Sequence, residues 1–392
     1  MKRKLDYVVT ASTQAVTLAA SRRTRTEKRN RVGRSLVGPA SFGGLGDQAF
    51  MLGALETEAR VNSESYGVVP GDAEPWRAID ADREFVSMAA FHRGRFPVLT
   101  ETGRAWARSN SIAVLGVDTV SGTYGHFSLA QRYEALNLSA ANGHRSQLVN
   151  FSVSDDITPL AIRMLESLHS DVELWVRDSL SRDRLEALAG IGDRVRVCPD
   201  VGIFLRAKDT DRSRRLEEDL GQGFITYVPN AHLAQLGWYS REDVVNIGAQ
   251  HLRLLREIGP VVVVPHDLRK KPGDVSLAAE ILETSGIRGN IFVPSSAAEA
   301  KAVIARSRFC LSARMHAAIA ALSSGVECVG LEYLNKFEGQ FAHFGKSDAI
   351  VQLEDFGDLA KVRCAIDSEL AAVTGAIQPD YTSIGWSRLL GS

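Results

Sequence analysis

The sequence lacks the features that mark several common classes of protein. Its four cysteines in 392 residues are widely spaced and form no Cys-x-x-Cys pair, which argues against a disulfide framework and a structural zinc site. It has no apolar run of membrane-spanning length, and a formal net charge of −1 gives no general attraction for nucleic acid. We therefore expect a cytoplasmic globular protein without metal or nucleic acid, large enough to hold two domains.

The short motifs of several enzyme classes are also missing. The glycine-rich stretch 41–47 has neither the dinucleotide-binding G-x-G-x-x-G spacing nor a Walker lysine. No Gly-x-Ser-x-Gly is present, and no group of carboxylates and histidines has the spacing of metal ligands. These absences argue against a serine hydrolase and a metalloenzyme, and we expect no cofactor.

Acidic residues are scarce at the N-terminus. Residues 1–34 contain ten Lys or Arg against two Asp or Glu, and the stretch between the basic clusters is too polar for a secretory signal or a membrane span. One interpretation is a weakly amphipathic segment that contacts an anionic membrane surface peripherally. The other is a solvated basic extension with no partner. The sequence leaves both open.

From residue 35 onward the chain alternates short apolar runs with helical patterns of about 10 to 15 residues, which predicts βαβ units and mostly parallel sheets. The charged segment 208–219 is interpreted as a solvated linker between two α/β halves. The predicted parts are a basic extension at 1–34, an N-terminal α/β domain at 35–215, a C-terminal α/β domain at 216–375 and a tail at 376–392. Strand-length runs occur at 36–38, 111–115, 148–151, 173–176, 195–198, 224–228, 261–264, 291–293, 309–311 and 326–331.

The stretch 312–345 concentrates the chemistry of the chain. Arg314 and His316 follow the apolar run 309–311, and Tyr333 and Lys336 follow the next apolar run. In an open parallel sheet the strand ends and the helix N-termini face the ligand crevice, and a helix N-terminus favours an anion. The pattern predicts a phosphate or carboxylate site. The alternative is that each of these side chains lies on a solvated face.

At this point the chain resembles the polysaccharide pyruvyl transferase family, over about residues 35 to 350. The C-terminal signature of that family is similar to Ser312-x-Arg314-x-His316 with Tyr333-x-x-Lys336 about twenty residues later. The other similar segments, in chain order, are Gly43-Gly44-Leu45-Gly46-Asp47-Gln48, Val176-Arg177-Asp178 with Ser181, Pro199-Asp200, and the strand from Val261 to His266.

The resemblance implies two Rossmann-like domains facing a central cleft, similar to the B-type glycosyltransferase fold. It implies transfer of the pyruvyl group of phosphoenolpyruvate onto two hydroxyls of a sugar in a polysaccharide or glycolipid, with release of phosphate. By this resemblance His316 is the acid/base, and Lys336 neutralises the departing phosphate or orients the donor. Arg314 and Arg177 hold the phosphate and carboxylate, because guanidinium groups bind such anions through paired hydrogen bonds.

Further donor contacts are expected from the Met315 backbone and from His266, which follows the strand at 261–264. The sugar acceptor, which could be lipid-linked, is expected to contact side chains in the glycine-rich turn, in the polar loop at 117–125 and after the last strand. These acceptor-binding candidates are Gly44, Asp47, Asp118, Tyr124 and Tyr333.

Two other functions compete with this interpretation. One is a B-type-fold glycosyltransferase that uses a nucleotide sugar, although Glu327, Glu332 and Glu338 lack the eight-residue spacing such enzymes often use. The other is a non-catalytic homologue that binds an anionic glycan. The identity of the acceptor sugar is not encoded in any motif of the sequence.

Overall fold

The computed structural model describes residues 33–38, 42–60, 65–87, 109–117, 119–122, 126–153, 157–187, 191, 194–269, 273–334 and 336–372. The contacts divide the chain into two compact units. One contains residues 1–42, 50–201 and 381–392, and the other contains 43–49 and 202–380. Residues 1–32 of the predicted basic extension and the whole predicted tail at 376–392 lie outside the described residues.

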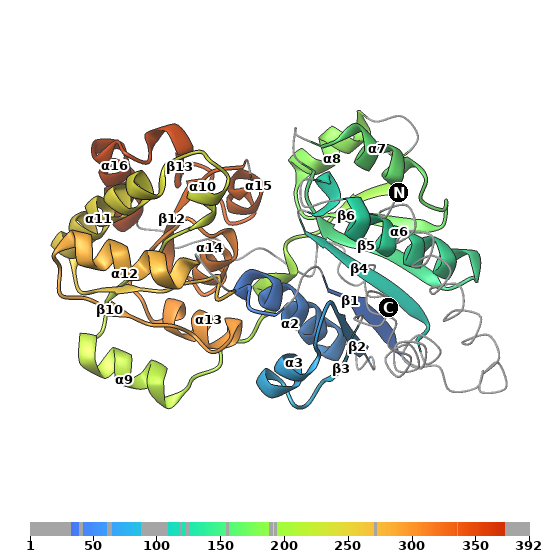
Figure 1. The fold of residues 1–392 in the computed structure, drawn as a ribbon, viewed down its shortest axis with the longest axis horizontal. Helices are drawn as coiled ribbons and strands as arrows, with labels where there is room; N and C mark the ends of the chain where they lie inside the picture. The colour runs from blue at the N-terminus through green and yellow to red at the C-terminus, as the bar shows by residue number, and fades with distance from the viewer. Residues whose placement is uncertain are drawn as a thin grey trace. The chain divides into compact units, whose positions relative to one another are not determined.

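The first unit is built on a seven-stranded sheet in the order β3-β2-β1-β4-β5-β6-β7, whose neighbouring strands are all parallel (Figure 1). Arg34, counted above with the basic extension, is the first residue of β1. It is buried and donates a hydrogen bond to Glu58 at 2.6 Å. The strands are β1 (Arg34–Val37), β2 (Ser65–Val69), β3 (Glu84–Ser87), β4 (Ser111–Val117), β5 (Arg145–Phe151), β6 (Val172–Val176) and β7 (Val195–Val197).

Helices of the first unit pack their apolar side chains on this sheet, and the core cluster joins side chains of α6, α7 and α8 to the strands. Helix α2 begins in the second unit and continues into the first. The helices are α2 (Leu45–Arg60), α3 (Glu74–Ile79), α6 (His126–Ala141), α7 (Pro159–Glu166) and α8 (Ser179–Glu186).

The second unit has a six-stranded parallel sheet in the order β10-β9-β8-β11-β12-β13. Numbered within the unit, this is the order 3-2-1-4-5-6 of a Rossmann fold. The sequence prediction of α/β halves with parallel sheets is confirmed. The strands are β8 (Ile225–Val228), β9 (Val261–Val263), β10 (Asn290–Ile291), β11 (Phe309–Ser312), β12 (Glu327–Glu332) and β13 (Ile350–Gln352).

Helix α11 packs on α12 and α16, whereas α13 packs on α14, so the sheet is covered by two groups of helices (Figure 1). None of the described helices is long and apolar enough to cross a membrane. The helices of the unit are α9 (Asp211–Leu220), α10 (His232–Gln235), α11 (Arg241–Ile258), α12 (Asp274–Ser285), α13 (Ala297–Ala305), α14 (Met315–Leu322), α15 (Phe337–Ala342) and α16 (Leu359–Ala371).

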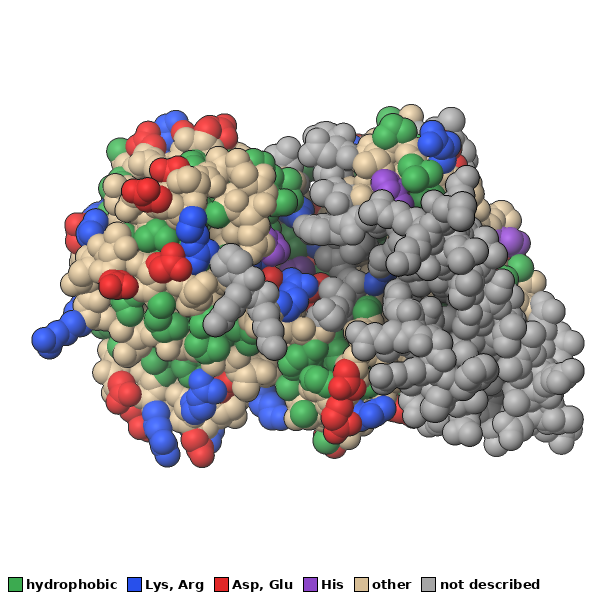
Figure 2. Space-filling view, in the orientation of Figure 1, with side chains coloured by type: hydrophobic (Ala, Val, Ile, Leu, Met, Phe, Trp, Pro, Cys, Tyr) green, Lys and Arg blue, Asp and Glu red, His purple; other side chains and the backbone are tan. Residues whose placement is uncertain are grey.

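The interpretation of 208–219 as a solvated linker is wrong for most of its length, because Asp211–Leu220 forms α9. Thr210 and Ser213 form a capping box at its start, which satisfies backbone amides of the first turn. Leu216 is buried, so the charged sequence still carries an apolar contact. Charges of both signs are interspersed over the visible face of the described residues (Figure 2).

Candidate active site

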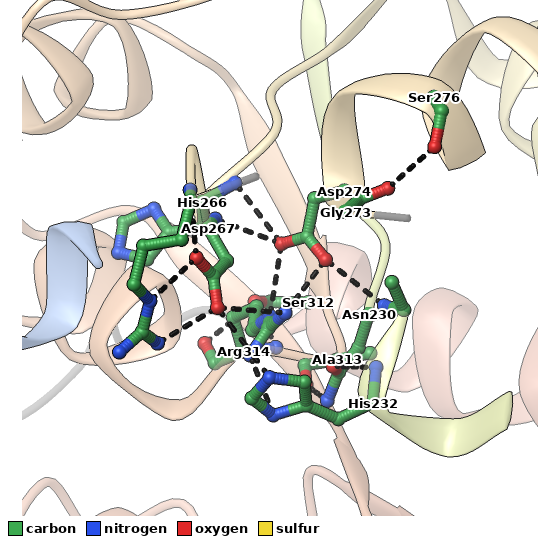
Figure 3. Close-up of polar contacts among 12 residues, drawn as sticks. Asn230, His232, His266, Asp267, Gly273, Asp274, Ser276, Ser312, Ala313 and Arg314 are labelled. Atoms are coloured by element: carbon green, nitrogen blue, oxygen red, sulfur yellow. Dashed lines mark hydrogen bonds and ion pairs between the residues drawn. The ribbon is translucent and has the colours of Figure 1, made fainter. Parts of the chain in front are cut away.

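The polar cluster of the second unit lies where three parallel strands end. Asn230 and His232 follow β8, His266 and Asp267 follow β9, and Arg314 follows β11. The sheet order turns back between β8 and β11, and ligands of open α/β sheets bind outside the carboxyl ends of the strands at such a switch point. The topology therefore brings residues more than 80 positions apart to one place (Figure 3).

The Asp274 carboxylate, at the start of α12, is at the centre of this cluster and is fully buried. It accepts hydrogen bonds from the backbone amides of Ala231 at 2.9 Å, His266 at 3.2 Å and Asp267 at 2.9 Å. It also accepts a two-pronged pair from Arg314, with Nε at 2.9 Å and Nη2 at 2.6 Å. One buried carboxylate thus ties together the ends of β8, β9 and β11 (Figure 3).

The guanidinium of Arg314, predicted to hold the donor, is directed at Asp274, and its side chain is only 11% exposed. Burial acts to lower the pKa of Arg314, but the Asp274 carboxylate outweighs it and raises the pKa above its ordinary value. Ser312 fixes the backbone here, because its hydroxyl accepts from the Arg314 amide at 3.1 Å. In this geometry Arg314 organises the site, and any contact with a donor uses its remaining N–H groups.

A second layer of charge lies beside the first. His232 Nδ1 lies 3.2 Å from Arg314 Nη1, and its Nε2 lies 3.4 Å from Asp267 Oδ2. Because a guanidinium only donates, Nδ1 accepts and the proton of a neutral His232 is on Nε2, facing Asp267. Arg269 holds Asp267 through Nε at 2.9 Å and Nη2 at 2.8 Å. Although burial acts in the opposite direction, hydrogen bonds from His232 and Arg269 bring the pKa of Asp267 well below its usual range.

The glycine-rich turn belongs to this site. Leu268 N donates to Gly43 O at 2.7 Å, and Gly44 pairs with Asp267 in an antiparallel bridge. A Cβ on Gly44 would lie 3.1 Å from the Arg269 guanidinium, so a side chain there would crowd the charged pair. Asp47 lies 3.4 Å from Arg269 Nη1. Gly44 and Asp47, predicted to bind the acceptor from the N-terminal half, are therefore grouped with the second unit.

His316 is the predicted acid/base, and the turn shapes its position. It is the second residue of α14, and a Cβ on Gly46 would come within 2.7 Å of its Nδ1. Only a glycine allows α2 and this imidazole to approach so closely. Met315 opens α14 with a buried side chain, and its backbone lies at the helix end that favours anions.

His266 completes the group, with a side chain that is almost fully buried. Burial above all, then the neighbouring His316 and Arg314, lowers its pKa to about 3. It is therefore neutral near pH 7. The structure thus brings together five predicted site residues: His266, Arg314, Met315, His316 and Gly44, with Asp47 beside them.

Tyr333 and Lys336 follow β12 in the same unit. Lys336 Nζ lies 5.6 Å from the centroid of the Tyr333 ring, a cation–π distance. Tyr333 in turn packs against Trp238, with ring centroids 5.5 Å apart. Their assignment to phosphate and sugar stays a prediction.

Arg177 lies in the first unit and its guanidinium is buried, 3.4 Å from Asp200. It also donates to the Ser152 hydroxyl. Asp178 caps α8, accepting from the Ser181 amide at 2.6 Å. The segments Val176-Arg177-Asp178 and Pro199-Asp200 therefore meet at the ends of β6 and β7, and the donor contact of Arg177 stays a prediction. Asp118 and Tyr124 lie outside the described residues.

Sequence reasoning expected a group of cations here and did not identify the carboxylates. The described cluster has two guanidiniums, Arg269 and Arg314, and three carboxylates, Asp47, Asp267 and Asp274. Asp274 gave no signal beyond that of an ordinary helix start. His232 follows the apolar run 224–228 at a strand end, which is the one signal that could have found it. Among the described residues no group of three or more His, Cys, Asp or Glu is placed to hold a metal.

Two Rossmann-like units with a polar cluster at a switch point are typical of the B-type glycosyltransferase fold class. Solved structures with this architecture are similar over most of the chain, at 10–12% identity. The UDP-GlcNAc 2-epimerase from Methanocaldococcus jannaschii has a TM-score of 0.60 at 10% identity, covering 91% of this chain and 98% of that one. Alr3699/HepE of Anabaena, in complex with UDP and glucose, has a TM-score of 0.59 at 12% identity, with coverages of 92% and 100%. A glycosyltransferase from Rickettsia africae has a TM-score of 0.52 at 11% identity, with coverages of 92% and 93%.

The family follows from the sequence. A profile of the polysaccharide pyruvyl transferase family matches residues 100–335, more than half of the chain. The chain therefore belongs to the polysaccharide pyruvyl transferase family, as the ordered motifs predicted. The match includes Arg177, His266 and the Arg314–His316 segment, and ends just before Lys336. The comparison with curated proteins gave no match.

Proposed function

We propose that this protein is a transferase that moves the pyruvyl group of phosphoenolpyruvate onto two hydroxyls of a sugar. The product is a cyclic ketal in a polysaccharide or glycolipid, and inorganic phosphate is released. The observation that carries the proposal is the position of His316 in the first turn of α14, close to Gly46 and two residues after the Arg314 that pairs with Asp274, in a chain of this family.

The first half of the reaction needs a proton donor. The methylene carbon of phosphoenolpyruvate takes a proton from the His316 imidazolium. This leaves a cationic carbon that bears the carboxylate and the phosphate. A sugar hydroxyl forms a bond to that carbon, and its proton passes to the imidazole of His316, which has just given one up. A positioned histidine contributes to such transfers because it gives and takes protons near neutral pH.

The second half breaks the bond between that carbon and the phosphate oxygen. Phosphate leaves with the electron pair, the second hydroxyl closes the ring, and its proton goes to the departing phosphate. One donor and two hydroxyls therefore give one ketal and one phosphate, with every proton accounted for. Lys336 would neutralise the departing phosphate.

Binding of the anionic donor is supported by the start of α14 and by Arg269. The first-turn amides of a helix lack partners within the helix, so the Met315 backbone suits a phosphate or carboxylate oxygen. Arg269 has the more exposed guanidinium of the cluster, at 38% against 11% for Arg314. We infer that Arg269 contacts the donor directly and that Arg314 mainly positions its surroundings.

The nucleotide-sugar alternative is weakened by the glutamates after β12. Glu332 is buried and accepts from the amides of Tyr333 at 2.8 Å and Leu334 at 2.9 Å. Glu327 is paired with Lys346 at 2.6 Å. Both carboxylates are engaged by the chain itself, which leaves them poorly suited to hold the hydroxyls of a nucleotide sugar.

The test is release of phosphate from phosphoenolpyruvate in the presence of methyl hexosides and lipid-linked sugars, with the ketal identified by its mass. The expected result is release only with an accepted sugar, and loss of release in His316→Asn. A matched control is His169→Asn in the first unit, whose side chain is 37% exposed, and it should retain full activity. Transfer of a hexose from a nucleotide sugar, or unaltered release in the folded His316→Asn variant, would overturn the proposal.

A further inference from the structure

The backbone of His266 is held in place, whereas its imidazole has no hydrogen-bond partner among the described residues. The residue is 6% exposed, and neither Nδ1 nor Nε2 has a hydrogen-bond partner among the described residues. Its backbone is held on both sides, with the amide donating to Asp274 and the carbonyl accepting from Leu45 at 3.0 Å. No dashed line ends on the ring in Figure 3. Since buried polar side-chain atoms in native proteins are nearly always paired, this ring is suited to a ligand group.

The protonation state of the ring restricts the chemistry of that ligand. Burial, together with His316 and Arg314, holds the pKa of His266 near 3, while Asp267 opposes this shift. A neutral imidazole has one N–H donor and one nitrogen lone pair. Phosphate and carboxylate oxygens of a fully ionised donor only accept, so they would leave the lone pair without a partner. A hydroxyl donates to that lone pair.

The surroundings of His266 also suit a hydroxyl-rich ligand. The turn at Gly44 pairs with Asp267, and Leu45 bonds to the His266 carbonyl, so the turn lies along this segment. The carboxylates of Asp47 and Asp267 border it, with side chains 16% and 10% exposed. Their negative charges repel a second anion, so the surroundings of the ring favour an uncharged ligand.

We propose that His266 binds a hydroxyl of the sugar acceptor through its unprotonated ring nitrogen, and so positions that hydroxyl beside the donor. This inference rests on the proposed function and changes one of its assignments, because sequence reasoning placed His266 among the donor-binding residues. His266 acts here as a binding and positioning residue. It takes no proton from the hydroxyl.

The experiment compares His266→Phe, which keeps a ring but removes both polar atoms, with His266→Gln, which keeps one donor and one acceptor. Steady-state kinetics of phosphate release are measured with the sugar and phosphoenolpyruvate varied separately. His266→Phe is expected to raise KM for the sugar about 10- to 100-fold, the factor for one hydrogen bond left unmade in a buried site. KM for phosphoenolpyruvate should change less than about twofold, and His266→Gln should recover part of the loss.

Kinetics at two pH values test whether the His266 ring acts as a cation. Because the ring stays neutral, His266→Phe should raise KM for the sugar by the same factor at pH 5.5 and at pH 8. The inference would be overturned if His266→Phe raised KM for phosphoenolpyruvate by a larger factor than KM for the sugar. It would also be overturned if the rise in KM for the sugar grew as the pH fell. His169→Phe serves as the control for a ring substitution outside the second unit.

Calorimetry distinguishes failure of the proposed function from failure of the inference about His266. If the wild-type chain transfers no pyruvyl group, the proposed function fails and the same methyl hexosides are titrated directly. Binding of a hexoside to the wild type and its loss in His266→Phe would still support the hydroxyl contact. A hexoside that binds both proteins equally, or binding of none of the panel, would overturn it.

Discussion

Removing the charge of Asp274 tests the central ion pair of the second unit. Asp274→Asn replaces one carboxylate oxygen by an amide nitrogen that cannot accept, although the carboxylate accepts three backbone amides and two N–H groups of Arg314. The Arg314 guanidinium would then be buried without its main counter-charge. Breaking one side of a buried pair costs about 3–5 kcal/mol. We expect Asp274→Asn to lower the free energy of unfolding of the second unit by this amount.

The assay is urea unfolding followed by circular dichroism and fluorescence, with the midpoint and slope recorded for each variant. Trp238 lies in the second unit, so the fluorescence includes a signal from that unit. The matched control is Glu280→Gln on the same helix, which removes a two-pronged pair with Arg241 at 2.8 and 3.0 Å. That glutamate is 45% exposed, and exposed pairs contribute only about 0.2–1 kcal/mol. The two variants lose similar numbers of hydrogen bonds to a guanidinium and differ in burial.

A double-mutant cycle separates the pair from its surroundings. Arg314→Met alone leaves the Asp274 carboxylate buried with only backbone donors, whereas Asp274→Asn with Arg314→Met leaves no unpaired charge. We expect the double variant to lose clearly less stability than the sum of the single variants, with a coupling of about 2 kcal/mol or more. Equal losses in Asp274→Asn and Glu280→Gln, or strict additivity in the cycle, would refute the assignment of Asp274 as the organising carboxylate.

Three further predictions follow from single positions. Gly46→Ala places a Cβ 2.7 Å from His316 Nδ1 and should lower turnover at least about tenfold with the fold retained; Gly357→Ala, whose Cβ would meet only Ile247 at 4.0 Å, is its control. Burial lowers the pKa of His251 to about 4 and of His266 to about 3, so between pH 6.5 and 4 the unfolded chain takes up protons that the folded chain does not. As the pH is lowered through this range, the free energy of unfolding should therefore fall by roughly 1.4 kcal/mol per pH unit for each histidine. The urea midpoint of His251→Gln should fall less steeply with pH than that of the wild type. Burial lowers the pKa of Lys301 to about 8, so stability should rise between pH 8 and 10.5, and unfolding curves of Lys301→Met should lose that rise; an unaltered alkaline slope in this variant would contradict the assignment.

Local sequence carried much of the fold and the order of the motifs. Strands formed at 225–228, 261–263 and 309–312. Each is a short run with apolar or β-branched side chains that is followed by polar or turn residues, the pattern typical of a buried strand. The Ala-rich segment after Arg314 became α14, which places His316 in its first turn. These are local properties, since hydrophobic period and helix propensity act over about ten residues. Segment 208–219 was misjudged because its apolar contact depends on one leucine among charges.

What the tertiary structure decided was which partner each site residue has. Arg314 meets Asp274, 40 residues earlier, and His232, 82 residues earlier, while Gly46 meets His316 across most of the chain. These contacts depend on the order of strands in the sheet, which sets which strand ends are neighbours and which no local pattern specifies. Residue types therefore indicated an anion site, whereas the sheet order added the carboxylates that neutralise its cations. It also left the buried, neutral ring of His266 without a hydrogen-bond partner among the described residues.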